Sequence, residues 1–200
     1  MLIFTDLDGT LFDTDVSKPK YIVEWIEEFS NARLKENARK VIEDLHADGH
    51  CIMALTSRGL NCEEFSDELH KISSASIIKS FESQQTIMGL QSSVEYKYPV
   101  MVKILNRVHF KQPYKLHKDV VLIDDDVEQI AISVLCGVKS ILFNPPQCFD
   151  KKDLLKFAGT IKDADKQIKK NLRVARDWVE VYSIIQEWDK SNKTEVAPQA

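Results

Sequence analysis

Short apolar runs alternate with amphipathic stretches along residues 1–145. The runs have the length of buried strands, and we expect strands at 2–5, 51–55, 120–123 and 139–143, with a weaker one at 76–79. Apolar residues at helical spacing lie between these runs and predict helices at 36–47, 61–72, 99–109 and 127–136. This alternation indicates an α/β fold with a doubly wound parallel sheet, which binds ligands beyond the carboxyl ends of its strands.

Two stretches interrupt the alternation in the predicted core, which we place at residues 1–150. Residues 14–34 form a short cap-like insertion after the first strand, and Tyr21–Phe29 within it has helical periodicity. Residues 80–96 are polar and lack helical spacing, so we expect a hairpin or flap there.

The pattern changes after Pro145-Pro146. A short helix is expected at 151–158 and a long one at 161–189, where apolar residues recur every three or four positions. The stripe comprises Ile168, Leu172, Ala175, Trp178, Val179, Tyr182, Ile185 and Trp188. We expect residues 151–190 to be a helical extension packed on the core; a surface for a partner or a further domain is the alternative. The polar residues 191–200 predict a disordered tail, and whether the natural chain continues past Ala200 stays open.

The strongest local signal is an apolar strand that runs into Asp6-Leu-Asp8-Gly-Thr. This segment resembles the first motif of the haloacid dehalogenase (HAD) superfamily. The next strand ends in Thr56, as the second motif of that family requires, and a later strand runs into Asp124-Asp125, which resembles the fourth motif in its double-aspartate form. The resemblance covers residues 1–145 and implies a Rossmann-like HAD phosphatase of the small-cap or capless type.

The spacing of the first motif suits phosphoryl transfer. Asp6 can attack phosphorus, and splitting hydrolysis through an aspartyl-phosphate makes two easier steps from one hard one. Asp8 can protonate the leaving group and then activate water, and Gly9 permits the turn that brings Asp8 over the site. By resemblance, Thr56 should hydrogen-bond the phosphoryl oxygens.

Crowded carboxylates repel one another, so these acids need a cation. Mg²⁺ prefers carboxylate and water oxygens. The expected cofactor is therefore Mg²⁺, and the expected ligands are Asp6, Asp8, Asp124 and Asp125. By analogy with the family, Asp125 binds directly and Asp124 binds directly or through water. Asp126 is predicted instead to cap the following helix. Some family members carry a further acid a few residues on, but here Gln129 falls near that place.

The third motif of the family is a lysine that offsets phosphate charge at the start of the helix before the fourth-motif strand. Lys97 fits best, because Pro99 suits the first turn of that helix. Lys103 is the rival, although it would lie inside the helix.

Composition limits the partners and the compartment. The formal net charge of −4 argues against nucleic acid. The spacing of the four cysteines (Cys51, Cys62, Cys136 and Cys148) resembles neither a zinc site nor a disulfide framework. Residues 2–5 already read as a core strand, and no apolar run is long enough to span a bilayer. We therefore expect reduced thiols, no signal peptide, no transmembrane segment and a cytoplasmic location.

The resemblance predicts a Mg²⁺-dependent phosphomonoester hydrolase. Because the insertions are short, we expect an open site, and open sites in this family tend to accept macromolecules. The substrate is then predicted to be a phosphorylated protein, with phosphotyrosine-like aryl phosphates accepted. A small-metabolite or nucleotide phosphatase is the alternative. A non-catalytic interaction module on a HAD scaffold is a further alternative, although the intact Asp6 and Asp8 argue against it.

Overall fold

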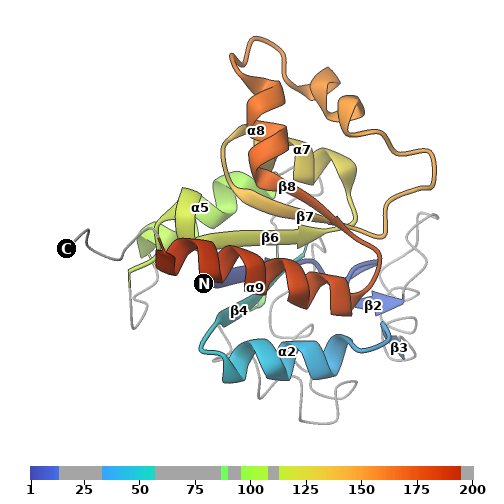
Figure 1. Cartoon of the computed structure of the whole chain (residues 1–200), viewed down its shortest axis with the longest axis vertical. Coiled ribbons are helices and arrows are strands. Elements are labelled where there is room, and N and C mark those ends of the chain that lie inside the picture. Colours follow the sequence, from blue (N-terminus) through green and yellow to red (C-terminus); the bar gives the residue numbers. More distant parts are fainter. Residues whose placement is uncertain (14–32, 57–86, 90–95, 108–112, 195–200) are drawn as a thin grey trace.

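The computed structural model describes residues 1–13, 33–56, 87–89, 96–107 and 113–194. Its centre is a six-stranded sheet in the order β5-β4-β1-β6-β7-β8 (Figure 1). Every neighbouring pair of strands is parallel. The strands are β1 (Leu2–Thr5), β4 (Cys51–Thr56), β5 (Ile87–Gly89), β6 (Val120–Asp124), β7 (Lys139–Phe143) and β8 (Leu172–Ala175).

Helices cover both faces of the sheet (Figure 1). They are α2 (Ala38–Ala47), α5 (Lys97–Arg107), α6 (Leu116–Asp119), α7 (Val127–Leu135), the 3₁₀ helix η2 (Lys151–Phe157), α8 (Ala164–Asn171) and α9 (Trp178–Thr194). Successive side chains of a strand point to opposite faces, so Ile3 packs with α2 and α9, while Leu2 and Phe4 pack with α5, α7 and α8. Both faces of the central strands are therefore buried, which confirms the doubly wound α/β fold.

Most predicted elements of the core are confirmed. The strands at 2–5, 51–55, 120–123 and 139–143 and three of the four helices form within a few residues of their expected bounds. Of the polar stretch at 80–96, Ile87–Gly89 is a strand that pairs in parallel with β4. The strand predicted at 76–79, the helix predicted at 61–72 and the helical segment Tyr21–Phe29 lie outside the described residues.

The continuous helix predicted over 161–189 is wrong. Helix α8 ends at Asn171, and Leu172–Ala175 pairs in parallel with β7 as the edge strand β8 before α9 begins. The sheet of the core therefore continues past residue 150. The predicted tail is also wrong at residues 191–194, which belong to α9, while 195–200 lie outside the described residues.

Helix α9 packs on the core rather than presenting its apolar side outward. Trp178, Val181, Ile185 and Trp188 are buried in the same cluster as α2. Val179, which the predicted stripe included, is 51% exposed. The buried face of α9 therefore includes Trp178, the first residue of the helix, whereas Val179 lies on the solvent-exposed side. None of the described helices has the length and apolarity that crossing a bilayer requires.

A two-stranded ladder marks the two ends of the predicted insertion. β2 (Phe12–Asp13) pairs antiparallel with β3 (Arg33–Leu34), and the Lys35 ammonium lies 2.9 Å from a carboxylate oxygen of Asp13. This ladder follows the loop after β1, and an isolated bridge between Asp8 and Phe12 connects it to the first motif.

Candidate active site

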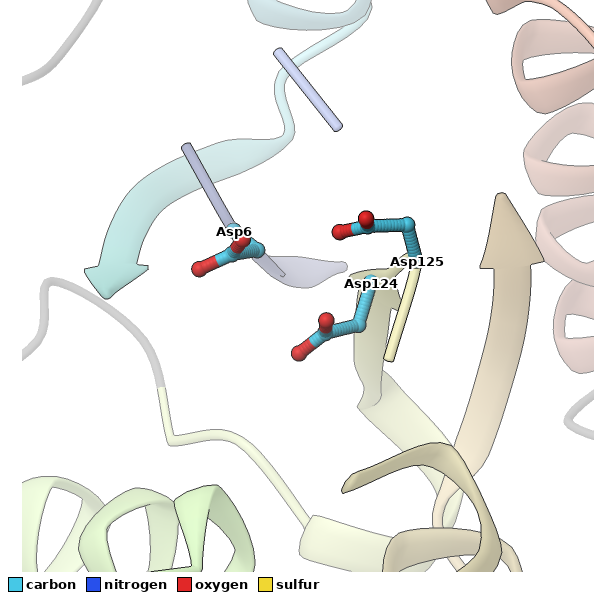
Figure 2. A group of neighbouring side chains, drawn as sticks. All are labelled: Asp6, Asp124 and Asp125. Carbon is cyan, nitrogen blue, oxygen red and sulfur yellow. The ribbon is translucent and has the colours of Figure 1, made fainter. Parts of the chain in front are cut away.

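The parallel sheet brings the predicted carboxylates together at the carboxyl ends of β1 and β6. The two strands are neighbours, and the backbone N–H of Asp6 donates to the carbonyl oxygen of Ile123 at 2.9 Å. Asp6, Asp124 and Asp125 each present a carboxylate oxygen within 4.8 Å of the others (Figure 2). We call these three residues the carboxylate cluster.

Lys97 is the cation of this cluster. Its Nζ donates to Asp6 Oδ1 at 2.5 Å and to Asp124 Oδ2 at 2.7 Å, and the residue is 1% exposed. Lys103 lies on an exposed part of the same helix. Of the two lysines that the sequence proposed, the fold brings Lys97 to Asp6.

Gln129 fixes the start of the helix that carries Lys97. Its side-chain Oε1 accepts the backbone N–H of Lys97 at 2.8 Å. Next to it, the Tyr96 hydroxyl donates to Glu128 at 2.7 Å, so residues 96–97 are tied to the first turn of α7 twice. Some HAD-superfamily members carry an acidic residue near the position of Gln129. In this chain the neutral side-chain amide of Gln129 binds the first residue of α5 instead.

Asp125 is held by the loop after β1. The Thr10 hydroxyl donates to Asp125 Oδ1 at 2.9 Å. Gly9 has a φ of +70°, and a Cβ at this position would lie 2.2 Å from Asp125 Oδ2. Glycine is therefore required here both by the backbone conformation and by the close approach of Asp125.

Three other residues were predicted to lie at or near the site: Asp126, Asp8 and Thr56. Asp126 accepts the backbone N–H groups of Glu128 and Gln129 and caps α7, as predicted. Asp8 is buried, but its side chain is not one of the three that form the carboxylate cluster. Thr56 is the last residue of β4, beside the end of β1, and its side chain lies outside the description.

Burial shifts the protonation equilibria of the cluster. It raises the pKa of Asp6 well above the ordinary value, and Lys97 opposes this rise. Burial, and then the charge of Asp124, raise the pKa of Asp125 to about 6. Burial alone would lower the pKa of Lys97, but the charges of Asp124 and Asp6 outweigh it and raise that pKa above its ordinary value. Burial therefore disfavours the ionised forms of Asp6 and Asp125 even with Lys97 nearby.

The donor set fits a hard divalent cation. When all three carboxylates are ionised, the described part of the chain places one ammonium against them, that of Lys97, which leaves an excess of two negative charges. All the cluster ligands are oxygens, which Mg²⁺ prefers, and a bound cation favours the ionised carboxylates that burial disfavours. Asp6, Asp124 and Asp125 are the described side chains that would hold it.

Comparisons with known proteins agree with this architecture. No protein-family model and no curated protein sequence matches the chain. A HAD-superfamily hydrolase from Ehrlichia chaffeensis has 13% identity and a TM-score of 0.56, and the match covers 93% of this chain and 96% of that one. The chain has the HAD fold.

Two further solved structures also match this chain over nearly the whole length of both proteins. D,D-heptose 1,7-bisphosphate phosphatase from B. bronchiseptica, complexed with magnesium and phosphate, has 13% identity and a TM-score of 0.59 over 93% of this chain and 98% of that one. A putative β-phosphoglucomutase from Bacteroides vulgatus has 14% identity and a TM-score of 0.59 over 96% and 90%.

Besides the contact from Gln129 to Lys97, sequence reasoning missed the supporting roles of two residues. Thr10 belongs to the first motif, but the sequence does not say that its hydroxyl binds Asp125. Trp178 lies far along the chain, and its indole Nε1–H donates to the carbonyl oxygen of Thr10 at 3.0 Å. Its apolar spacing was the only sequence signal, and that signal indicates burial without naming a partner.

Proposed function

We propose that the protein is a Mg²⁺-dependent phosphomonoester hydrolase that acts through an aspartyl-phosphate on Asp6. One observation carries the proposal: Asp6 lies at the carboxyl edge of the sheet with Lys97 bound to one oxygen and two further carboxylates beside it. A non-catalytic scaffold has no need for such a concentration of buried charge, which is costly to retain without a function.

In the first step, a carboxylate oxygen of Asp6 attacks phosphorus and the bond from phosphorus to the leaving oxygen breaks. Asp8 gives its proton to that oxygen. In the second step, Asp8 takes a proton from water, the water oxygen attacks phosphorus, and the bond to Asp6 breaks to release inorganic phosphate. The first half-reaction leaves Asp6 phosphorylated and Asp8 deprotonated, and the second restores both aspartates.

Charge control supports both steps. Bound Mg²⁺ would neutralise charge on the transferring phosphoryl group and the cluster. Lys97 supplies a fixed positive charge next to Asp6 and limits its mobility. Thr56, at the end of β4, is proposed to hydrogen-bond a phosphoryl oxygen. Asp8 remains a proposed fourth metal ligand beside the cluster.

Two substrate classes are proposed. The phosphoprotein prediction rests on short insertions, and residues 14–32 and 57–86, which decide how open the site is, lie outside the described residues. Small phosphorylated metabolites gain support from the heptose bisphosphate phosphatase and the putative phosphoglucomutase, whose chains are nearly fully covered by this one. We therefore rank a small-metabolite phosphatase first and a phosphotyrosine-type protein phosphatase second.

The test is phosphate release from para-nitrophenyl phosphate, a panel of sugar phosphates and nucleotides, and a panel of phosphopeptides. We expect release with Mg²⁺, none with EDTA, and a loss of activity in Asp6→Asn. The panel that is hydrolysed faster identifies the substrate class. A folded wild-type protein that releases no phosphate from any of them would contradict the proposal.

We also infer that the protein works in a reducing compartment such as the cytoplasm. Among the described cysteines, Cys51, Cys136 and Cys148 form no disulfide, and Cys51 is buried in the core. Disulfides are rare in such compartments. Cys62 lies outside the described residues.

A further inference from the structure

The carboxyl-terminal region reaches the site through Trp178. The indole Nε1–H donates to the carbonyl oxygen of Thr10 at 3.0 Å, a contact between residues 168 positions apart. The hydroxyl of the same Thr10 donates to Asp125 Oδ1 at 2.9 Å. One residue of the loop after β1 is therefore held from α9 and in turn holds a carboxylate of the cluster.

Trp178 lies at this edge because β8 ends there. Ala175 pairs with Phe143 at the ends of β8 and β7, and the backbone N–H of Asn144 donates to the carbonyl oxygen of Ala175 at 2.7 Å. Helix α9 therefore begins at the carboxyl edge of the sheet. The ring of Trp178 packs on that of Phe143, with 5.8 Å between the ring centroids, so the indole is fixed by apolar packing as well as by its hydrogen bond.

The loop has little freedom to compensate for a change at Thr10. The backbone N–H groups of Leu11 and Phe12 both donate to the carbonyl oxygen of Leu7, which closes the loop on itself. Gly9 allows no Cβ beside Asp125. A shift of Thr10 is thus passed on to Asp125 and to the neighbouring Asp8.

We propose that Trp178 is a positioning residue for the metal site: it fixes the loop so that Thr10 orients Asp125 within the carboxylate cluster. This role rests on the proposed function, because it concerns the same cation and the same reaction. It assigns a task to the region after residue 150, in which the sequence shows no motif of the family.

The variant that tests this role is Trp178→Phe, which keeps an aromatic ring against Phe143 and deletes the N–H donor. Trp188→Phe is the matched control. It lies on the same helix and is also buried, but its ring lies beside Lys139 at the start of β7, at the opposite edge of the sheet. Both variants lose comparable apolar volume, so a purely structural effect appears in both.

Mg²⁺ affinity is measured by calorimetry, and kcat and KM are measured with para-nitrophenyl phosphate. We expect Trp178→Phe to bind Mg²⁺ roughly 2- to 10-fold more weakly, the range that loss of one hydrogen bond gives, and to lose kcat by a similar factor with little change in KM. Trp188→Phe should match the wild type in both, even where its thermal stability is lower. Equal Mg²⁺ affinity in the wild type and Trp178→Phe would overturn the role.

A second measurement covers the case in which Trp178→Phe does not fold. The chain has three tryptophans, so three indole N–H signals are expected in ¹⁵N NMR spectra of the wild type. Addition of Mg²⁺ should shift the Trp178 signal and leave that of Trp188 in place; an unmoved Trp178 signal on a protein that binds Mg²⁺ would overturn the inference alone. A wild type that neither binds Mg²⁺ nor releases phosphate would overturn the proposed function, and this role with it.

Discussion

At the scale of single residues, the site is defined by the pairing of Lys97 with Asp6 and Asp124. Replacing Lys97 by Met would leave buried carboxylates without their cation. We expect a cost of about 3 kcal/mol or more in the free energy of unfolding in EDTA at neutral pH, and loss of phosphatase activity. Urea unfolding and phosphate release measure the two effects.

Lys103→Met is the control on the same helix, because Lys103 is exposed on it. This variant should keep both the stability and the activity of the wild type. Loss of activity in Lys103→Met, with normal activity in Lys97→Met, would show that the wrong lysine has been assigned to the phosphate.

Protonation of Asp125 sets a pH limit on metal binding. Its pKa is raised to about 6, so the carboxyl group is ionised at neutral pH and increasingly protonated below it. Because a metal must displace that proton, Mg²⁺ affinity should fall by about tenfold or more for each pH unit below 6. Calorimetric titration over this range is the measurement, and an affinity that is unchanged down to about pH 5 would exclude Asp125 as a ligand.

The raised pKa of Asp125 has the opposite effect on the metal-free protein, whose stability it increases at low pH rather than at high pH. A carboxyl group whose pKa is higher in the folded state favours folding at low pH, so its contribution is lost as pH rises from about 4 to about 6. In EDTA, wild-type protein should therefore lose stability over this interval relative to Asp125→Asn. Denaturant unfolding at several pH values provides this control.

Gly9 combines a left-handed backbone with contact to Asp125, and the two effects are separable. Gly49 has a φ of +84° but nothing within 4 Å of an added Cβ. We expect Gly9→Ala and Gly49→Ala each to lose about 1–2 kcal/mol of stability from the backbone. Only Gly9→Ala should also lose Mg²⁺ affinity, measured by calorimetry, because its Cβ displaces Asp125. If Gly9→Ala binds Mg²⁺ as tightly as the wild type, the observed position of Asp125 is not required for Mg²⁺ binding.

At the scale of elements, α9 has one face that carries its stability. Ile185 is fully buried, whereas Val179 is 51% exposed. Ile185→Ala should cost about 2–4 kcal/mol and Val179→Ala less than about 0.5 kcal/mol in urea unfolding. If the two variants lose similar amounts of unfolding free energy, α9 is rotated about its axis relative to the packing described above.

The sequence predicted elements where their length and period were unambiguous. The apolar runs at 2–5 and 120–123 are buried on both faces, and their strands formed where expected. Leu172–Ala175 was missed because Leu172 and Ala175 also fit a helical period with Ile168 and Trp178. Pairing with the free edge of β7 decides between helix and strand here, and such a tertiary effect is not visible in local spacing.

The same limit applies to the site. Asp6, Asp124 and Asp125 were found because they follow apolar strands, and the carboxyl ends of parallel strands meet at one edge. Lys97 was preferred to Lys103 from the position of Pro99, and the fold places Lys97 beside Asp6. The contacts from Trp178 to Thr10 and from Gln129 to Lys97 join elements distant in sequence, so no spacing rule could reveal them.

At the scale of the whole molecule, the order of the strands explains why the site lies where it does. β1 and β6 are adjacent in the middle of the sheet, and β7 and β8 extend it to the point where α9 begins. Two regions far apart in the sequence therefore meet at the site: the loop after β1 supplies Asp6 and Asp8, and the first residue of α9, Trp178, supports that loop. The carboxyl-terminal region is part of the structure that holds the cluster.

The central claim is that Asp6 carries the phosphoryl group, and detection of that adduct tests it most directly. In Asp8→Asn, para-nitrophenolate leaves without a proton, but water is no longer activated, so the adduct should accumulate. Acid quenching followed by peptide mass spectrometry should then find a phosphoryl group on Asp6 that appears only with Mg²⁺ and is absent from Asp6→Asn. Phosphate release by Asp6→Asn at the wild-type rate, with no adduct on Asp6 in Asp8→Asn, would contradict the account.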